Sequence, residues 1–286
     1  MRILITVVAA LTVLAPGISA ADSVTTLEQI GKSGKIRIGY RQSEPPMSFR
    51  DKEGNPVGYS IDLCARIVTA VKAHLDNPGI TVDYVPVNAQ NRFDALTENK
   101  IDILCGATTK TLSRGEFVDF TQLTFATGAS LMSLQNTPVN TLGDLQGKKV
   151  AVTKNTTTET VLKSALKQTS TDAEVVIVDS AVQGFDMLKN EEVAAYSADQ
   201  VVLIGLLLTS DVPRRYGVSE ITFSYEPFAL AVRRNDADFR LIADRVLSQI
   251  YRTGEILQIY KKWFNLFSKK IPNAIAAVYQ INATPE

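Results

Sequence analysis

Charged and hydroxyl side chains follow the ends of several predicted strands and have the chemistry to hold a small zwitterion. Arginine presents a planar fork that binds a carboxylate through two hydrogen bonds, and the free N–H groups at the start of a helix attract anions. A single carboxylate can then take an ammonium group. The residues at these positions are Arg41, Arg92, Thr108, Thr109, Arg114, Thr156, Thr157, Thr158 and Asp199. Taken alone, their placement predicts a site for a polar small molecule and nothing narrower.

The composition excludes several other kinds of site. The 286 residues carry 30 Lys and Arg against 30 Asp and Glu, so there is no excess of positive charge to neutralise nucleic-acid phosphates. His74 is the only histidine, which rules out sites built from several histidines, as in most zinc hydrolases. It falls in an amphipathic helix, which disfavours a catalytic triad. We expect no metal, no cofactor, no nucleic-acid partner and no catalytic residue.

Strands and helices alternate along the chain, and one unit occurs twice. In the first half, Phe93 in a short helix precedes the start of a strand at Ile101 by eight residues. In the second half, Phe185 precedes Val193 by the same spacing, at an offset of 92 residues. The predicted strands of the two halves are 35–40, 81–87, 101–105, 149–153, 174–178 and 193–197.

This repetition predicts two similar α/β lobes joined by a two-segment hinge, not one continuous sheet. The chain is expected to cross between the lobes near 130–134 and 225–230, and helices at 236–252 and 255–267 are expected to add to the core of a lobe. The predicted divisions are 22–131 plus 227–270 for lobe 1, 132–226 for lobe 2, and 271–286 for a loosely packed C-terminal tail.

The N-terminus has the layout of a secretory signal peptide over residues 1–21. Arg2 supplies a positive charge, residues 3–15 are almost wholly apolar, and small residues precede Asp22. This apolar run is shorter than the ~20 residues that span a bilayer. The first cysteine is Cys64, so the cleavage point offers no site for a lipid. We expect a soluble protein secreted to a bacterial periplasm, although a Gram-positive exterior also fits.

Cys64 and Cys105 are the only two cysteines, and in an oxidising compartment they can form a disulfide. Two small buried apolar side chains are the alternative. Ser60 is expected to cap the helix that carries Cys64. The buried stripe predicted for that helix consists of Ile61, Cys64, Ile67, Val68, Val71 and Leu75.

The segment Gly58–Val68 resembles the signature of the periplasmic amino-acid solute-binding proteins (family 3) of ABC importers. The resemblance covers roughly Leu27 to Phe267, and Ser60 stands where the pattern usually has an acid. Further motifs resemble the glutamate/aspartate-binding branch: Gln90-Asn91-Arg92, Cys105-Gly106-Ala107-Thr108-Thr109, Thr156-Thr157 and Lys262-Trp263-Phe264. The resemblance implies a type II periplasmic-binding-protein-like fold whose lobes close on an amino acid.

The resemblance also implies a role for each ligand-binding residue. Arg41 and Arg92 would clamp the side-chain carboxylate of glutamate or aspartate. The α-carboxylate is expected at Arg114, Thr109, Thr156 and Thr157, and the α-ammonium at Asp199 and the backbone near Ala107.

Some positions depart from the pattern of that branch. Its small hydroxyls and a histidine are replaced here by Ala89, Ala107 and Ala181, and Asn155 stands where a glycine is usual. Losing those donors weakens the case for a buried acidic ligand, whereas two arginines without partners would be costly to bury. Alternatively, one arginine pairs with a protein acid such as Glu44, and the preferred ligand then has a neutral or amide side chain.

Hinge closure is the mechanism that the resemblance implies: a monomer closes on its ligand, and ABC permease subunits in the inner membrane recognise the closed form. An exported cyclohexadienyl or arogenate dehydratase is the alternative on this fold, with Glu44 or Glu159 as the acid. A third possibility keeps the binding chemistry but delivers the ligand to a sensor.

Overall fold

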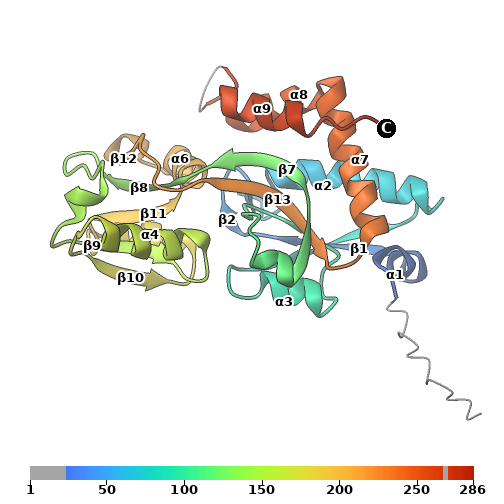
Figure 1. Ribbon diagram of the computed structural model, residues 1–286, viewed down its shortest axis with the longest axis horizontal. Coiled ribbons are helices and arrows are strands. Elements are labelled where there is room, and N and C mark those ends of the chain that lie inside the picture. Colours follow the sequence, from blue (N-terminus) through green and yellow to red (C-terminus); the bar gives the residue numbers. More distant parts are fainter. Residues whose placement is uncertain (1–23, 267–269) are drawn as a thin grey trace, which may run out of the picture.

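The computed structural model describes residues 24–266 and 270–286, and it consists of two lobes lying along the long axis of the molecule (Figure 1). Each lobe is built on a five-stranded sheet covered by helices. The prediction of two similar α/β lobes is confirmed. The predicted signal peptide, residues 1–21, lies outside the described residues.

The first lobe has the sheet order β5-β1-β6-β13-β7. β1 runs parallel to β5 and β6, whereas β13 is antiparallel to β6 and β7. The strands are β1 (Lys35–Tyr40), β5 (Thr81–Pro86), β6 (Ile103–Cys105), β7 (Val118–Thr127) and β13 (Glu226–Arg233). The helices are α1 (Thr26–Ser33), α2 (Tyr59–His74), α3 (Arg92–Thr97), α7 (Ala237–Thr253), α8 (Glu255–Phe264) and α9 (Asn273–Ile281).

Side-chain alternation along β6 explains why helices cover both faces of this sheet. Successive residues of a strand point to opposite faces, so Ile103 and Cys105 enter the core beneath α2 and α7. Leu104 enters a smaller core beneath α3. The strand is apolar throughout because neither face meets water.

The second lobe repeats this arrangement with the order β10-β9-β11-β8-β12. β9 is parallel to β10 and β11, and β8 is antiparallel to β11 and β12. The strands are β8 (Ala129–Leu134), β9 (Lys149–Thr153), β10 (Glu174–Val178), β11 (Ala195–Asp199) and β12 (Tyr216–Val218). The helices are α4 (Thr157–Gln168), α5 (Ala181–Lys189) and α6 (Gln200–Thr209). Phe93 in α3 and Phe185 in α5 occupy equivalent places, as the sequence repeat predicts.

Two segments connect the lobes, and the first crossing lies earlier than predicted. β8 begins at Ala129 and already pairs within the second sheet, so the chain crosses at Gly128. The chain returns just before β13, which starts at Glu226. A side chain on Gly128 would overlap the Ser224 carbonyl oxygen, because the two crossing segments are pressed together. Residues 129–131 therefore belong to the second lobe and not to the first.

A small hairpin sheet follows β1 and leads into α2. Its strands are β2 (Ser43–Glu44), β3 (Ser48–Arg50) and β4 (Pro56–Val57). The apolar stripe predicted for α2 is buried from Ile61 to Val71, but the predicted cap is wrong. Gly58 precedes the helix, and the buried Ser60 hydroxyl instead donates a hydrogen bond to the Gly106 carbonyl oxygen at 3.1 Å.

The residues after Ile271 form a packed helix and not a loose tail. α9 lies against β7 and α7, and Ile275, Val278 and Tyr279 are buried. The Tyr279 hydroxyl meets the Tyr59 hydroxyl of α2 at 3.0 Å. Apolar residues recur at helical spacing in this segment, and their burial stabilises the helix. The polar residues at the end of the chain made this pattern easy to overlook.

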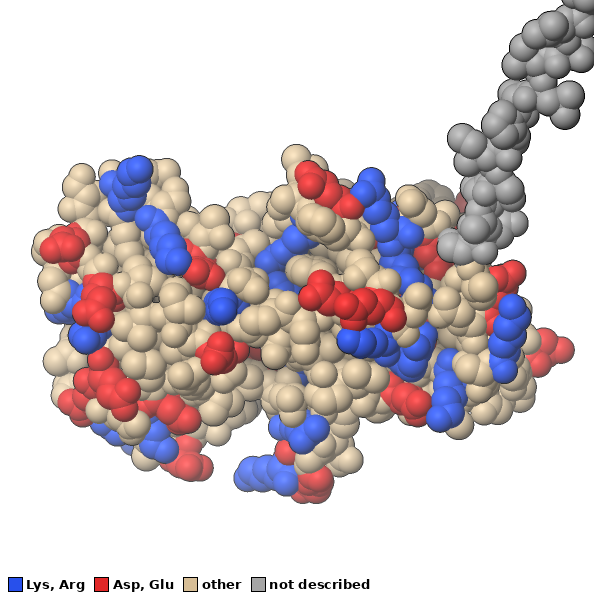
Figure 2. All heavy atoms as spheres, turned by 90° about the horizontal axis from the view of Figure 1, so that it is seen from below, with Lys and Arg blue, Asp and Glu red and all other residues tan. Residues whose placement is uncertain are grey.

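The surface charges are mixed in sign. On the face seen in Figure 2, basic and acidic side chains alternate over both lobes without a large patch of one sign. His74 ends α2 and is exposed. Among the described residues, no helix is both long and apolar enough to cross a membrane.

Candidate functional site

Predicted site residues of both lobes lie together where the lobes meet. Asp199 of the second lobe interacts electrostatically with Arg41, Arg92 and Arg114 of the first. Their places in the fold are the end of β1 for Arg41, the start of α3 for Arg92, the segments after β6 for Ala107, Thr109 and Arg114, the start of α4 for Thr156 and Thr157, and the end of β11 for Asp199. Their roles toward a ligand remain predictions.

Arg41 is neutralised by a protein carboxylate. The β2 strand follows β1 directly and folds Glu44 back over Arg41, with Nη2 of the arginine 2.7 Å from Oε1 of the glutamate. Both side chains are nearly buried. Oε2 of Glu44 is buried and has no hydrogen-bond partner among the described residues. The ion pair is the one that the sequence offered as the alternative to a free arginine clamp.

Arg92 is a buried cation whose hydrogen-bonding capacity is only partly used. It donates to the Ala89 carbonyl oxygen and, across the lobes, to the Asn155 carbonyl oxygen at 3.3 Å. Its Nε is buried without a partner in the described part of the chain. Burial lowers the pKa of Arg92 well below its usual value, and the nearby charges of Arg41 and Arg114 lower it further. An anion bound here would relieve both effects.

Phe93 supports two of the arginines, which the sequence did not indicate. The guanidinium carbon of Arg92 lies 4.6 Å from the centre of the Phe93 ring, and that of Arg114 lies 5.3 Å from it. The face of an aromatic ring attracts cations, so Phe93 holds both guanidinium groups toward the cleft. The sequence identified Phe93 only as part of the repeated unit.

A second carboxylate, Glu226, joins the hydroxyl-bearing residues of both lobes. Its Oε2 accepts hydrogen bonds from Thr109 Oγ1 at 2.6 Å and from Thr157 Oγ1 at 2.7 Å. Arg114 donates to the Thr109 carbonyl oxygen at 2.7 Å. Burial lowers the pKa of Arg114, while the charges of Glu226 and Asp199 oppose that change.

The start of α4 presents backbone N–H groups to the cleft, but the Thr156 hydroxyl is committed to the helix cap. Thr156 Oγ1 accepts from the Glu159 N–H at 3.1 Å and donates to the Thr153 carbonyl oxygen at 2.7 Å. Any contribution of Thr156 to anion binding must therefore come from its backbone. Asn155 has φ of 59°, a left-handed conformation that glycine adopts freely and that asparagine tolerates. Asn155 thus keeps a backbone conformation that a glycine would also adopt.

Asp199 is a buried acid, and one of its carboxyl oxygens has no hydrogen-bond partner among the described residues. Its Oδ1 is shielded from solvent and has no hydrogen bond within the described residues, and its side chain does not cap α6. Burial raises the pKa of Asp199 well above its usual value, and the charges of Glu226 and Glu44 add to this against Arg114 and Arg41. A bound ammonium group would reverse this effect, because it stabilises the ionised carboxylate.

The lobes are in contact around a small internal cavity. Glu44 of the first lobe and Asp199 of the second both line this cavity, together with Ala181, and its volume is about 20 Å³. Gln90 donates to the Asp179 carbonyl oxygen at 3.4 Å across the same interface. A larger pocket, of about 610 Å³, lies at the rim between Arg114 and the first turn of α4. The arrangement is that of a closed cleft, which must open to admit a solute.

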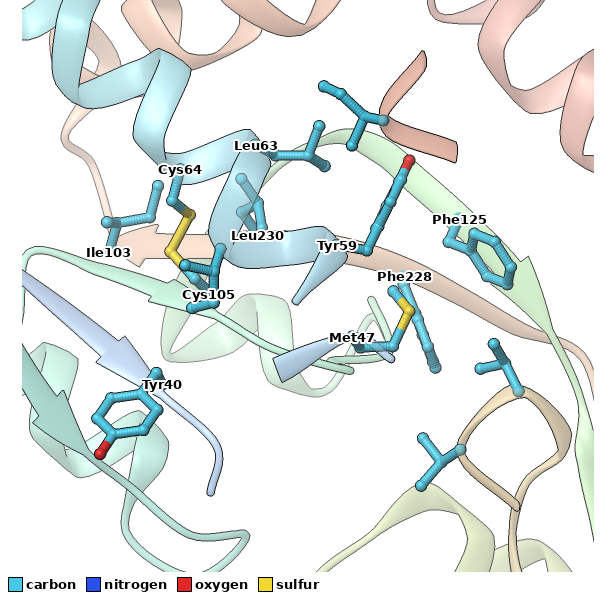
Figure 3. Close-up of a cluster of buried hydrophobic side chains, with 14 of the residues drawn as sticks. Tyr40, Met47, Tyr59, Leu63, Cys64, Ile103, Cys105, Phe125, Phe228 and Leu230 are labelled. Atoms are coloured by element: carbon cyan, nitrogen blue, oxygen red, sulfur yellow. A yellow bond between two sulfur atoms is a disulfide. The ribbon is translucent and has the colours of Figure 1, made fainter. Parts of the chain in front are cut away.

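The disulfide that the sequence left open is present between Cys64 and Cys105. Figure 3 shows it tying α2 to the end of β6, beside a cluster of buried aromatic rings that includes Tyr59, Phe125 and Phe228. The segment that begins at Gly106 and carries Thr109 follows directly. The bond therefore anchors one side of the candidate site to the core of the first lobe.

Neither acid considered for catalysis is placed as a proton donor. Glu44 is ion-paired with Arg41. Partial burial alone would raise the pKa of Glu159, but hydrogen bonds from Lys163 and the Asn155 backbone outweigh it and the pKa is lowered. Within residues 24–266 and 270–286, no group of three or more His, Cys, Asp or Glu side chains is arranged to hold a metal ion.

Comparison with known proteins identifies the class. Residues 36–266 match the bacterial extracellular solute-binding proteins, family 3, and the chain belongs to that family. It is an amino-acid solute-binding protein of the kind that serves ABC importers.

Individual relatives and solved structures that resemble the chain differ in the ligands for which they are named. The chain is 33% identical to an L-glutamate/L-aspartate-binding protein of Pseudomonas aeruginosa, over 85% of this chain and 82% of that one. Among solved structures, an ancestral arginine-binding protein bound to glutamine is 28% identical with a TM-score of 0.72, covering 81% of this chain and 98% of that one. An ancestral amino acid-binding protein described as a precursor of cyclohexadienyl dehydratase is 25% identical with a TM-score of 0.71, over 84% and 99% of the two chains.

Proposed function

We propose that this protein captures an acidic amino acid, glutamate or aspartate, between its lobes and delivers it to the permease subunits of an ABC importer. One observation carries this proposal. Arg92 Nε and Asp199 Oδ1, from a base and an acid that interact electrostatically, are buried at the same site without hydrogen-bond partners in the described structure. A zwitterion supplies both missing partners at once, and leaving either group unpaired costs stability.

In this proposal the charges of the ligand are distributed over the two lobes. Arg114 and the N–H groups at the start of α4 hold the α-carboxylate. Asp199 takes the α-ammonium with the backbone near Ala107, and Arg92 takes the side-chain carboxylate with Arg41. The similarity to the L-glutamate/L-aspartate-binding protein of Pseudomonas aeruginosa supports an acidic ligand.

Calorimetric titration with L-glutamate, L-aspartate, L-glutamine and L-asparagine tests the proposal. Binding of the acidic pair is expected, and Arg114→Ala and Asp199→Ala should each abolish it without unfolding the protein. The matched control is Arg66→Ala, since the Arg66–Glu255 ion pair lies on the surface and is expected to contribute little. Near-normal affinity in Arg114→Ala or Asp199→Ala would contradict the assigned site.

The ion pair between Arg41 and Glu44 favours a second candidate ligand, a neutral amino acid with an amide side chain. With Arg41 neutralised, the second carboxylate of glutamate would approach Glu44 and be repelled, whereas an amide N–H could donate to the unpaired Glu44 Oε2. The same titrations separate the candidates, because tighter binding of glutamine than of glutamate would select the second.

We further propose that the protein is exported to the periplasm as a monomer and does not catalyse a reaction. The solved precursor of cyclohexadienyl dehydratase motivates an assay for turnover of prephenate and arogenate. Because Glu159 has a lowered pKa and Glu44 is ion-paired, neither is suited to protonate a leaving group. Turnover above the uncatalysed rate would overturn this part of the proposal. Delivery to a sensor would appear instead as specific binding with no effect on uptake when the gene is deleted.

A further inference from the structure

Glu226 is a buried carboxylate to which the proposed function gives no role. It is the first residue of β13, at the point where the chain returns to the first lobe, and it is 1% exposed. Besides Thr109 and Thr157, it accepts a hydrogen bond at Oε1 from Ser224 Oγ at 2.9 Å. Three hydroxyl groups thus surround one carboxylate at the hinge.

These hydrogen bonds connect both lobes to the crossing segment. Thr109 follows β6 in the first lobe, and Thr157 begins α4 in the second. Their hydroxyl oxygens lie 3.2 Å apart, and each lies within 2.7 Å of the same Glu226 oxygen. Such short contacts to a carboxylate are charge-assisted hydrogen bonds, which hold donors in a defined direction.

The direction of these hydrogen bonds decides what the hydroxyl groups can offer a ligand. A threonine hydroxyl has one proton and two lone pairs. When both protons point to Glu226, the two oxygens can only accept further hydrogen bonds. They can therefore receive the N–H groups of an α-ammonium, but they cannot donate to an α-carboxylate. Any contact of Thr109 with the α-carboxylate must then come from its backbone, beside Arg114 and the α4 backbone.

The charged groups near Glu226 also favour an ammonium group at this position. Glu226 and Asp199 interact electrostatically, so two acidic groups share the place where the ammonium is expected, and a bound ammonium would favour the ionised form of Asp199. Arg114 interacts with both carboxylates and completes a dipole that matches the α-amino and α-carboxylate groups.

We infer that Glu226 is a positioning residue for the α-ammonium: it orients the Thr109 and Thr157 hydroxyls as acceptors and couples both lobes to the hinge. The inference rests on the proposed function, because it requires that the protein binds an amino acid. It does not depend on which side chain that amino acid carries.

Glu226→Gln tests the inference, because the amide can donate an N–H to a threonine oxygen and so occupy an acceptor. L-glutamate and L-glutamine, whichever bind the wild type, should bind the variant about 10-fold to 100-fold more weakly, as expected for a charged hydrogen bond. Glutarate, which lacks the α-amino group, should change by less than about 3-fold in competition experiments, the scatter that a remote surface change produces. An equal loss for glutarate, or no loss for the amino acids, would overturn the inference.

Thr109→Val provides a second test that needs no stable Glu226 variant. Valine removes the acceptor, so amino-acid binding should weaken by a similar factor; the melting temperature should fall as well, because the buried Glu226 carboxylate loses one donor. In the double variant the two losses should not multiply, because both changes act through the same oxygen. Fully multiplicative losses would contradict the mechanism. A wild-type protein that binds no amino acid refutes the proposed function itself.

Discussion

Replacing Glu44 by glutamine should change the selectivity between acidic and amide ligands. Glu44 lies 2.7 Å from Arg41, and a ligand carboxylate that reaches the same guanidinium would lie about 5 Å from Glu44. At an effective dielectric constant of about 20, two such charges repel by about 3 kcal/mol. Because 1.4 kcal/mol corresponds to a factor of ten, removing this repulsion should strengthen glutamate binding by up to about 100-fold.

Glutamine has a neutral side chain and should respond differently. Its affinity for Glu44→Gln should stay within about 3-fold of the wild-type value or fall, because the amide loses an acceptor and gains no relief from charge repulsion. The ligand-free variant should also melt at a lower temperature, since Arg41 keeps its charge in a buried place without an ionic partner. Glutamate should restore that stability.

Calorimetric titration of glutamate and glutamine into both proteins gives the affinity ratio directly. The matched control is Glu53→Gln, which removes one exposed acid from the hairpin loop of the same lobe without touching the cleft. Weaker glutamate binding by Glu44→Gln would refute the argument, because it would mean that Glu44 holds Arg41 in position for the ligand. An equal gain for glutamine would refute it as well.

Three further changes should separate binding from folding. Asp199→Asn should abolish amino-acid binding and raise the melting temperature of the ligand-free protein. Because the pKa of Asp199 is raised, the ligand-free wild type loses stability as pH rises, and the variant should lack this pH dependence. A lower melting temperature in the variant would contradict an acid that lacks a hydrogen-bond partner. Gly205→Ala should weaken binding at least 10-fold without loss of folding stability. The added Cβ would overlap the Pro45 carbonyl oxygen of the other lobe, and opening of the cleft between the lobes relieves this overlap. Solution scattering should therefore show an expanded protein. Replacing Cys64 and Cys105 by serine should lower the free energy of unfolding, measured with urea, by about 4 kcal/mol, because the disulfide closes a loop with a sequence separation of 41 residues. An unchanged urea midpoint would exclude the disulfide.

Local sequence patterns predicted the helices and strands well, because these elements depend mainly on residues that are close in sequence. The apolar spacing from Ile61 to Val71 defined the buried face of α2, and the spacing of Phe93 and Phe185 defined the repeated unit. One error arose where a distant contact replaced a local one. Ser60 has the side chain of a helix cap but donates to Gly106, 46 residues away.

Part of the candidate site could also be predicted from the sequence. Residues at the carboxyl ends of parallel strands meet at one edge whatever the details of packing, so Arg41 and Asp199 could be identified from their positions. Glu226 could not, because it lies 117 residues from Thr109 and 69 from Thr157 along the chain. A glutamate at the start of a strand has no local pattern that marks it as buried.

The order of residue types along the chain determined the two lobes, the family and the kinds of charge available to a ligand. These follow from periodicity and composition, which act over a few turns of helix or strand. Only the tertiary structure decided which charges are used within the protein and which are left for a solute. Arg41 pairs with Glu44, while Arg92 Nε and Asp199 Oδ1 have no partners among the described residues. Pairing of charges depends on distances of a few ångströms between segments, and those distances are set when the lobes pack.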